Sequence, residues 1–89
     1  MDLPEPTIQD VLNRLRRVEG QIRGIQQMLV DKRECRDVVT QISAASKALD
    51  QAGFKLIASG LTYCVNDPDR AAREGYAIED VQKMFMKLA

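Results

Sequence analysis

Apolar side chains recur at steps of three and four along most of the chain, which is the spacing of one face of an α-helix. The first series lies within residues 7–30 and comprises Ile8, Val11, Leu15, Val18, Ile22, Ile25 and Leu29. Thr7 stands before it with Asp10 three residues later, which resembles a capping box. The pattern therefore predicts a first helix over residues 7–30.

A second series follows a short polar connection at residues 31–33, which is typical of a turn between antiparallel neighbours. This series predicts a helix that continues to about Val65, with apolar positions at Val38, Ile42, Ala45, Leu49, Ala52 and Leu56. Asp67 and Pro68 are typical of a helix boundary. Between Pro68 and Glu74 the pattern allows either a short turn or a kinked continuation of the helix.

Gly75 breaks the pattern, and a short third helix is predicted from the apolar residues Ile78, Val81, Phe85 and Leu88. No segment alternates apolar and polar residues as a strand does. The predicted fold class is therefore all-α, with a three-helix protomer. We expect residues 1–6 to be a disordered N-terminal segment and residues 7–89 to form a single helical domain.

A chain of 89 residues has little core of its own. Domains of this size bury only about 60% of the surface that the unfolded chain exposes, and many depend on disulfides, metals or oligomerisation. Two cysteines and no histidine exclude a disulfide framework and a closed four-ligand zinc site within one chain. Oligomerisation is the support that remains.

The chain has no stretch near the roughly 20 apolar residues that span a bilayer. Residues 1–6 lack the basic and apolar regions of a signal peptide. We therefore expect a cytoplasmic protein without a membrane partner, in which cysteines are reduced thiols.

Basic residues are concentrated in one part of the chain, although 13 basic and 13 acidic residues balance overall. Residues 14–36 include seven basic residues and only three acidic ones. On the first predicted helix, Arg16 and Arg23 point away from the apolar face, together with Gly20 and Gly24. An oligomer would repeat this local excess in every protomer, which favours binding to an acidic polymer. The alternative is an ordinary solvated face.

The two cysteines, Cys35 and Cys64, lie at opposite ends of the second predicted helix. A spacing of 29 residues corresponds to roughly 43 Å along a helix and returns to nearly the same face. Two copies of this helix, antiparallel about a twofold axis near Leu49 and Asp50, would bring Cys35 of one chain beside Cys64 of the other, twice per dimer. The alternative is that both thiols are inert packing residues.

Cys35 lies in the first helical turn, where free amides, the helix dipole and nearby basic residues favour the thiolate. These basic residues are Lys32, Arg33 and Arg36, and Glu34 and Asp37 partly oppose them. Cys64 lies at the opposite helix end, where the dipole disfavours the anion. Cys35 is therefore the predicted nucleophile and Cys64 its resolving partner.

Several blocks of sequence within residues 10–65 resemble the copper-sensitive operon repressor (CsoR) family. They are Arg14–Ile25 (RLRRVEGQIRGI), Cys35, Thr40–Ala44, Ala48–Asp50 and Cys64–Val65. The resemblance implies an antiparallel dimer that assembles into a disc-shaped tetramer and represses transcription until an inducer binds between subunits. It also implies that double-stranded operator DNA binds a basic surface that includes the first helix. The residues we assign to DNA binding are Arg14, Arg16, Arg17 and Arg23, with Gln21 as a polar contact.

One departure from the family concerns the inducer. Its copper, nickel and formaldehyde sensors carry a histidine four residues before the position of Cys64, where this chain has Gly60. Two cysteines without that histidine resemble the persulfide-sensing (CstR-like) branch, so a persulfide or polysulfide is the predicted inducer. Cys35 would attack the sulfane sulfur and Cys64 of the partner would complete the bridge.

Two alternatives remain. Copper(I) could bind linearly between the same two thiolates, which are soft ligands suited to it. The chain could instead be a redox-active helical oligomer with no affinity for DNA. Catalytic residues, a cofactor and a resident metal are not expected, so the chain is not predicted to be an enzyme.

Overall fold

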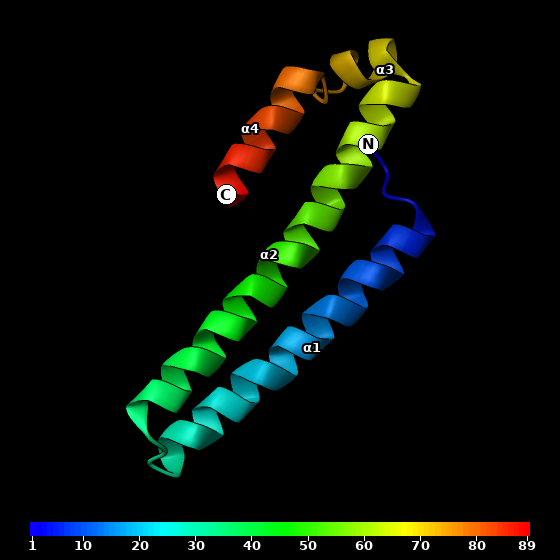
Figure 1. Ribbon diagram of the computed structural model, residues 1–89. Helices are drawn as coiled ribbons and strands as arrows, with labels where there is room; N and C mark the ends of the chain where they lie inside the picture. Colours follow the sequence, from blue (N-terminus) through cyan, green and yellow to red (C-terminus); the bar gives the residue numbers. More distant parts are fainter.

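The computed structural model describes all residues from 1 to 89 and is built only of helices (Figure 1). They are α1 (Glu5–Val30), α2 (Cys35–Asn66), α3 (Pro68–Arg73) and α4 (Ile78–Leu88). α1 and α2 form a long antiparallel hairpin, and after α3 the chain turns back so that α4 runs along α2. α1, α3 and α4 each pack against α2 and not against one another. The predicted all-α class is confirmed.

The first helix begins at Glu5, two residues earlier than predicted. Pro6 lies in its first turn, where a residue without an N–H is tolerated because that group would have no partner within the helix. The predicted capping box is wrong, because the residue at the N-cap is Pro4. Thr7 instead shares a hydrogen bond with Ser59 of α2, with 3.2 Å between their hydroxyl oxygens.

The number of helices also differs from the prediction, because the segment after α2 forms a separate helix of six residues. Asp67 ends α2 and caps α3, where its carboxylate accepts a hydrogen bond from the amide of Arg70 at 3.4 Å. Ala71 is fully buried. Gly75 has a φ of 82°, a left-handed conformation that glycine adopts without steric cost, and it lets the chain turn towards α4.

α4 approaches α2 closely because α2 has a glycine at the point of contact. A Cβ atom built at Gly53 would lie 2.5 Å from Cδ2 of Leu88, which is too short for a real contact. Nearby, the rings of Phe54 and Phe85 meet with their centroids 5.6 Å apart. The end of α4 is therefore packed into a space that a larger residue would fill.

Few residues of this protomer are buried, and those few are small. The eight buried residues are Val11, Val18, Val38, Ala45, Ala52, Gly60, Ala71 and Val81. Larger residues of the predicted apolar faces remain about half exposed: Ile22 by 46%, Ile42 by 50% and Leu49 by 49%. A hairpin of two long helices covers only one side of each helix, so the other half of these side chains remains in contact with water.

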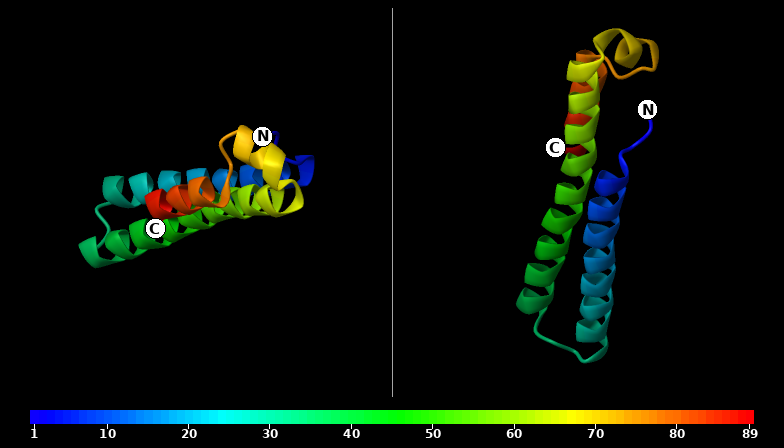
Figure 2. Two further views of the ribbon diagram at one scale, coloured as in Figure 1. Left: turned by 90° about the horizontal axis from the view of Figure 1, so that it is seen from above. Right: turned by 90° about the vertical axis from the view of Figure 1, so that its right-hand side faces the viewer.

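The protomer is long and flat, with extents of 55 × 25 × 14 Å (Figure 2). Its radius of gyration is 16.9 Å, whereas a compact domain of this length has about 12 Å. Its accessible surface is 6589 Å², whereas about 5,200 Å² is typical of a monomer of this mass. The excess surface includes the half-exposed apolar side chains, and this supports the predicted need for association. None of the four helices is long and apolar enough to cross a membrane.

Candidate functional site

The two cysteines occupy the two ends of α2. Cys35 is the first residue of the helix and is exposed, whereas Cys64 lies in the last turn and is half-buried. Both are free thiols. Because α2 is one unbroken helix of 32 residues, the thiols are separated by about 43 Å along its axis. A bridge between them must therefore join two chains.

Cys35 shares the N-terminus of α2 with a carboxylate. Glu34 is the N-cap residue, and its side chain accepts a hydrogen bond from the amide of Arg36 at 2.6 Å. One of the first-turn amides that could favour a thiolate therefore already has an anionic partner. The remaining positive charge near Cys35 comes from the side chains of Arg36 and of Lys32 and Arg33 in the preceding turn.

Cys64 follows a tyrosine that ties the end of α2 to the next segment. The hydroxyl of Tyr63 donates a hydrogen bond to the carboxylate of Glu74, which lies 3.5 Å from Nε of Arg70. The ring of Tyr63 also meets that of Tyr76, with centroids 6.2 Å apart. No local motif signals this link, because Tyr63 and Glu74 are 11 residues apart. Through Tyr63, the end of α2 that carries Cys64 is thus in contact with the turn that follows α3.

Gly60, one helical turn before Cys64, lies beneath α4. The residue is buried, and a Cβ atom there would lie 3.8 Å from Cγ2 of Val81 and 4.0 Å from the ring of Tyr76. A methyl group would therefore fit at this position in ordinary van der Waals contact. No three residues among histidine, cysteine, aspartate and glutamate are grouped to hold a metal within the chain. The soft donor at this end of α2 is the single thiol of Cys64.

Three of the four arginines assigned to DNA binding lie on exposed positions of α1. Arg16 donates a hydrogen bond to the side chain of Asn13 at 3.2 Å, and Arg23 lies 4.0 Å from Glu19. Arg17 is exposed as well and has no ion-pair partner in the chain. Arg14 is different, because its side chain lies beside α2 and pairs with Asp10 at 3.0 Å.

Gln21 is less accessible than the three exposed arginines of α1. The residue is half-buried, and its Oε1 atom is shielded from solvent without a hydrogen-bond partner. Its part in DNA binding stays a prediction. Gly20 and Gly24 face open space, because a Cβ atom at either position would meet nothing within 4 Å. Close packing within the protomer is therefore not the reason for these two glycines.

The sequence and the structure both match known regulators. A family model described as "Metal-sensitive transcriptional repressor" matches residues 7–87. The chain belongs to this family. The metal-sensitive repressors are regulators of transcription, so the prediction that the chain is not an enzyme is confirmed, as is its resemblance to CsoR proteins.

Two curated repressors of this family illustrate the likeness in sequence. The copper-sensing transcriptional repressor CsoR of Bacillus subtilis (strain 168) is 36% identical over 77 residues, which cover 86% of this chain and 76% of the relative. The copper-sensing transcriptional repressor RicR of Mycobacterium tuberculosis (strain H37Rv) is 48% identical over 62 residues, which cover 70% of this chain and 62% of the relative.

Two solved structures of metal-sensitive repressors share the fold. The copper-sensing repressor CsoR with Cu(I) from Geobacillus thermodenitrificans NG80-2 has a TM-score of 0.74 and 34% identity, covering 99% of this chain and 88% of that one. The nickel-responsive transcriptional regulator InrS has a TM-score of 0.73 and 30% identity, covering 91% of both chains. These relatives are named for copper or nickel, and none of them is named for persulfide.

Proposed function

We propose that this chain is a homo-oligomeric repressor that binds double-stranded operator DNA and releases it when an inducer bridges Cys35 of one protomer and Cys64 of its partner. The observation that carries this proposal is the position of the two thiols at the two ends of an unbroken α2. Neither thiol can reach the other within one chain, whereas an antiparallel partner brings both pairs together.

The surface between the two thiols supports such a partner. Cys35, Ile42, Leu49 and Leu56 follow one another at seven-residue intervals, so they form a stripe that turns only about 20° per step. We call the three apolar members, Ile42, Leu49 and Leu56, the apolar stripe of α2, and all three are exposed in the protomer. A second copy of α2 packed antiparallel on this stripe would remove it from water.

A second apolar surface supports assembly beyond the dimer. A groove between α2 and α4 is lined mostly by apolar residues, among which Leu61, Ile78, Phe85 and Met86 are exposed. Because this groove is distinct from the apolar stripe of α2, two different contacts are available to each protomer. Two twofold contacts of this kind generate a tetramer with closed symmetry.

DNA binding is supported by the exposed arginines of α1. Arg16, Arg17 and Arg23 are exposed in the protomer, so each chain offers three cations to phosphates. Contacts with phosphates release counterions, so the affinity should fall steeply as the salt concentration rises. Because contacts with phosphates carry no sequence information, part of the sequence preference would come from DNA shape.

Copper(I) is the inducer that the relatives support, since both curated repressors and the Geobacillus structure are named for copper. Thiolates are soft ligands that suit copper(I). Without an imidazole, and with the position of Gly60 covered by α4, the two thiolates would hold the ion in a linear arrangement. We therefore propose copper(I) as the first candidate inducer.

A persulfide is the second candidate, favoured by the absence of any histidine from the donor set. The thiolate of Cys35 would attack the outer sulfur of a persulfide RSSH, and the thiol RSH would leave. Cys64 of the partner would then attack the inner sulfur of the Cys35 persulfide and displace hydrogen sulfide. One persulfide and two protein thiols thus give one thiol, one hydrogen sulfide and one interchain disulfide.

The test compares both inducers on reduced protein kept free of oxygen. Release of a fluorescent duplex from the region upstream of the gene is followed during titration with copper(I), buffered by a chelator, or with glutathione persulfide. X-ray absorption then distinguishes two-coordinate copper, and non-reducing mass spectrometry detects joined peptides of Cys35 and Cys64. If neither copper(I) nor glutathione persulfide releases the duplex, the proposed sensing role is refuted.

Cys35→Ser should bind the duplex as tightly as the wild type but should not release it with either inducer. The serine preserves the size of the side chain and removes the nucleophile and soft ligand. Normal release of this variant would show that Cys35 is not part of the bridge. Failure of the wild type to bind any duplex would refute the repressor function itself.

A further inference from the structure

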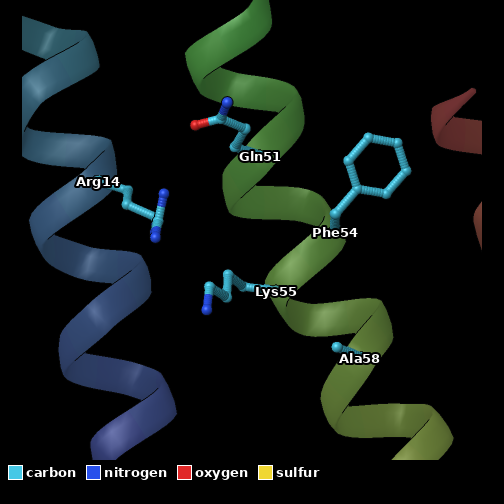
Figure 3. Close-up of a pocket in the computed structure, with 5 residues that line it drawn as sticks. All are labelled: Arg14, Gln51, Phe54, Lys55 and Ala58. Carbon is cyan, nitrogen blue, oxygen red and sulfur yellow. The ribbon is translucent and has the colours of Figure 1, made fainter.

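A pocket on the surface between α1 and α2 collects cationic and amide groups from both helices. It has a volume of about 450 Å³ and is lined by Arg14, Gln51, Phe54, Lys55 and Ala58 (Figure 3). Figure 3 shows that the side chains of Arg14 and Lys55 extend into the space between the helices, whereas the ring of Phe54 points away from it. The polar side of this pocket is therefore rich in hydrogen-bond donors.

One carboxylate bridges the two cations of the pocket. Oδ1 of Asp10 accepts a hydrogen bond from Nε of Arg14 at 3.0 Å, and Oδ2 of Asp10 lies 3.7 Å from Nζ of Lys55. The terminal N–H groups of Arg14 form no other ion pair within the chain. One negative charge faces two positive charges, so the pocket keeps an excess of one positive charge and several unused donors.

The side chain of Arg14 is more confined than that of Arg23, the other α1 arginine in an ion pair. Its side chain is 29% exposed, whereas that of Arg23 is 79% exposed. A side chain that is already confined loses less conformational freedom when it binds a ligand. The planar guanidinium suits the oxygens of a phosphate, which it can contact through two N–H groups at once.

We propose that this pocket binds one backbone phosphate of the DNA, and that Asp10 occupies the place of the phosphate in the free protein. The inference rests on the DNA-binding function proposed above. Asp10 holds Arg14 and Lys55 towards the same point, and the phosphate displaces it from Lys55 when DNA binds. This displacement costs little because both ion pairs are partly exposed to solvent and therefore weak.

The DNA footprint then continues from the outward arginines of α1 across to α2. Lys55 and Gln51 of α2 become DNA contacts that the sequence did not indicate. Asp10 becomes a residue that weakens DNA binding, since its charge must be displaced before the phosphate can bind. These two roles predict opposite effects of two single substitutions.

The experiment measures fluorescence anisotropy with a labelled duplex from the upstream region and a scrambled duplex of equal length, at several salt concentrations. Lys55→Gln should weaken binding to both duplexes about tenfold and reduce the salt dependence by about one phosphate contact per engaged protomer. Asp10→Asn should tighten binding to both duplexes. Lys83→Gln is the matched control, because Lys83 is an exposed lysine on α4, which does not contact α1.

Lys55→Arg, which keeps the charge, should restore most of the binding, and equal circular dichroism spectra would exclude misfolding as the cause of any loss. Equal affinities of Lys55→Gln and Lys83→Gln would overturn the assignment of the pocket. Weaker binding by Asp10→Asn would overturn the role of Asp10. In either case the wild type would still bind DNA, so the proposed function would stand; no binding by the wild type would refute both.

Discussion

Leu49→Glu tests whether the apolar stripe of α2 is an interface between protomers. Leu49 is half exposed in the protomer and lies near the midpoint between Cys35 and Cys64. In the proposed antiparallel dimer it lies beside the twofold axis, so a substitution there acts twice and places the two new charges close together.

The size of the effect follows from the exposed half of the side chain. Complete burial of a leucine contributes about 1.5–3 kcal/mol, so the half that remains to be buried contributes about 1 kcal/mol per copy and about 2 kcal/mol per dimer. Removing two facing carboxylates from water adds a cost of at least about 2 kcal/mol. A total of about 4 kcal/mol corresponds to a roughly thousandfold increase in the dissociation constant of the dimer.

Sedimentation velocity over a range of protein concentrations measures this change. The matched control is Ser43→Glu, which adds the same charge to an exposed position of α2 about 120° around the helix from Leu49. Leu49→Glu should sediment as a smaller species and should no longer give joined peptides of Cys35 and Cys64 after treatment with a persulfide. Association of Leu49→Glu at wild-type strength, or equal dissociation of both variants, would refute the proposed interface.

Two further predictions concern glycines. Gly20→Ala and Gly24→Ala should each raise the free energy of unfolding by up to about 1 kcal/mol. Alanine favours the helix, and its methyl group would meet no other atom of the protomer. A lower melting temperature of either variant would mean that another copy packs closely on this face. Gly53→Ala should be less stable than Gly20→Ala by about 1–3 kcal/mol, because its methyl group overlaps Leu88. Combining Gly53→Ala with Leu88→Ala should remove most of that difference in thermal unfolding, and purely additive effects would contradict the contact.

The long helices could be predicted from the sequence because their apolar residues repeat over many turns. The short helix predicted from Ile78 onwards is confirmed as α4, and its apolar residues repeat in the same way. α3 could not be predicted as a separate helix, because six residues with one buried side chain, Ala71, carry no periodicity. The sequence predicts the start of α1 two residues too late because Thr7 resembles a cap, whereas its hydroxyl shares a hydrogen bond with Ser59, 52 residues away.

The positions of the thiols could be predicted from the sequence, because helix geometry alone separates Cys35 from Cys64. The contacts around them could not. Tyr63 meets Glu74 only because α3 turns the chain back, and Asp10 meets Lys55 only because α1 and α2 lie side by side in one register. Such pairs depend on the tertiary arrangement, and nothing in the local sequence marks them.

The unbroken α2 has a consequence for the shape of the response. In the antiparallel dimer, one pair of thiols lies at each end of the two packed α2 helices. The first bridge fixes the two α2 helices relative to each other, so the second pair of thiols meets at a high effective concentration. The second bridge then forms more readily than the first. We therefore expect a steep, switch-like transition from the reduced to the doubly bridged repressor over a narrow range of inducer concentration.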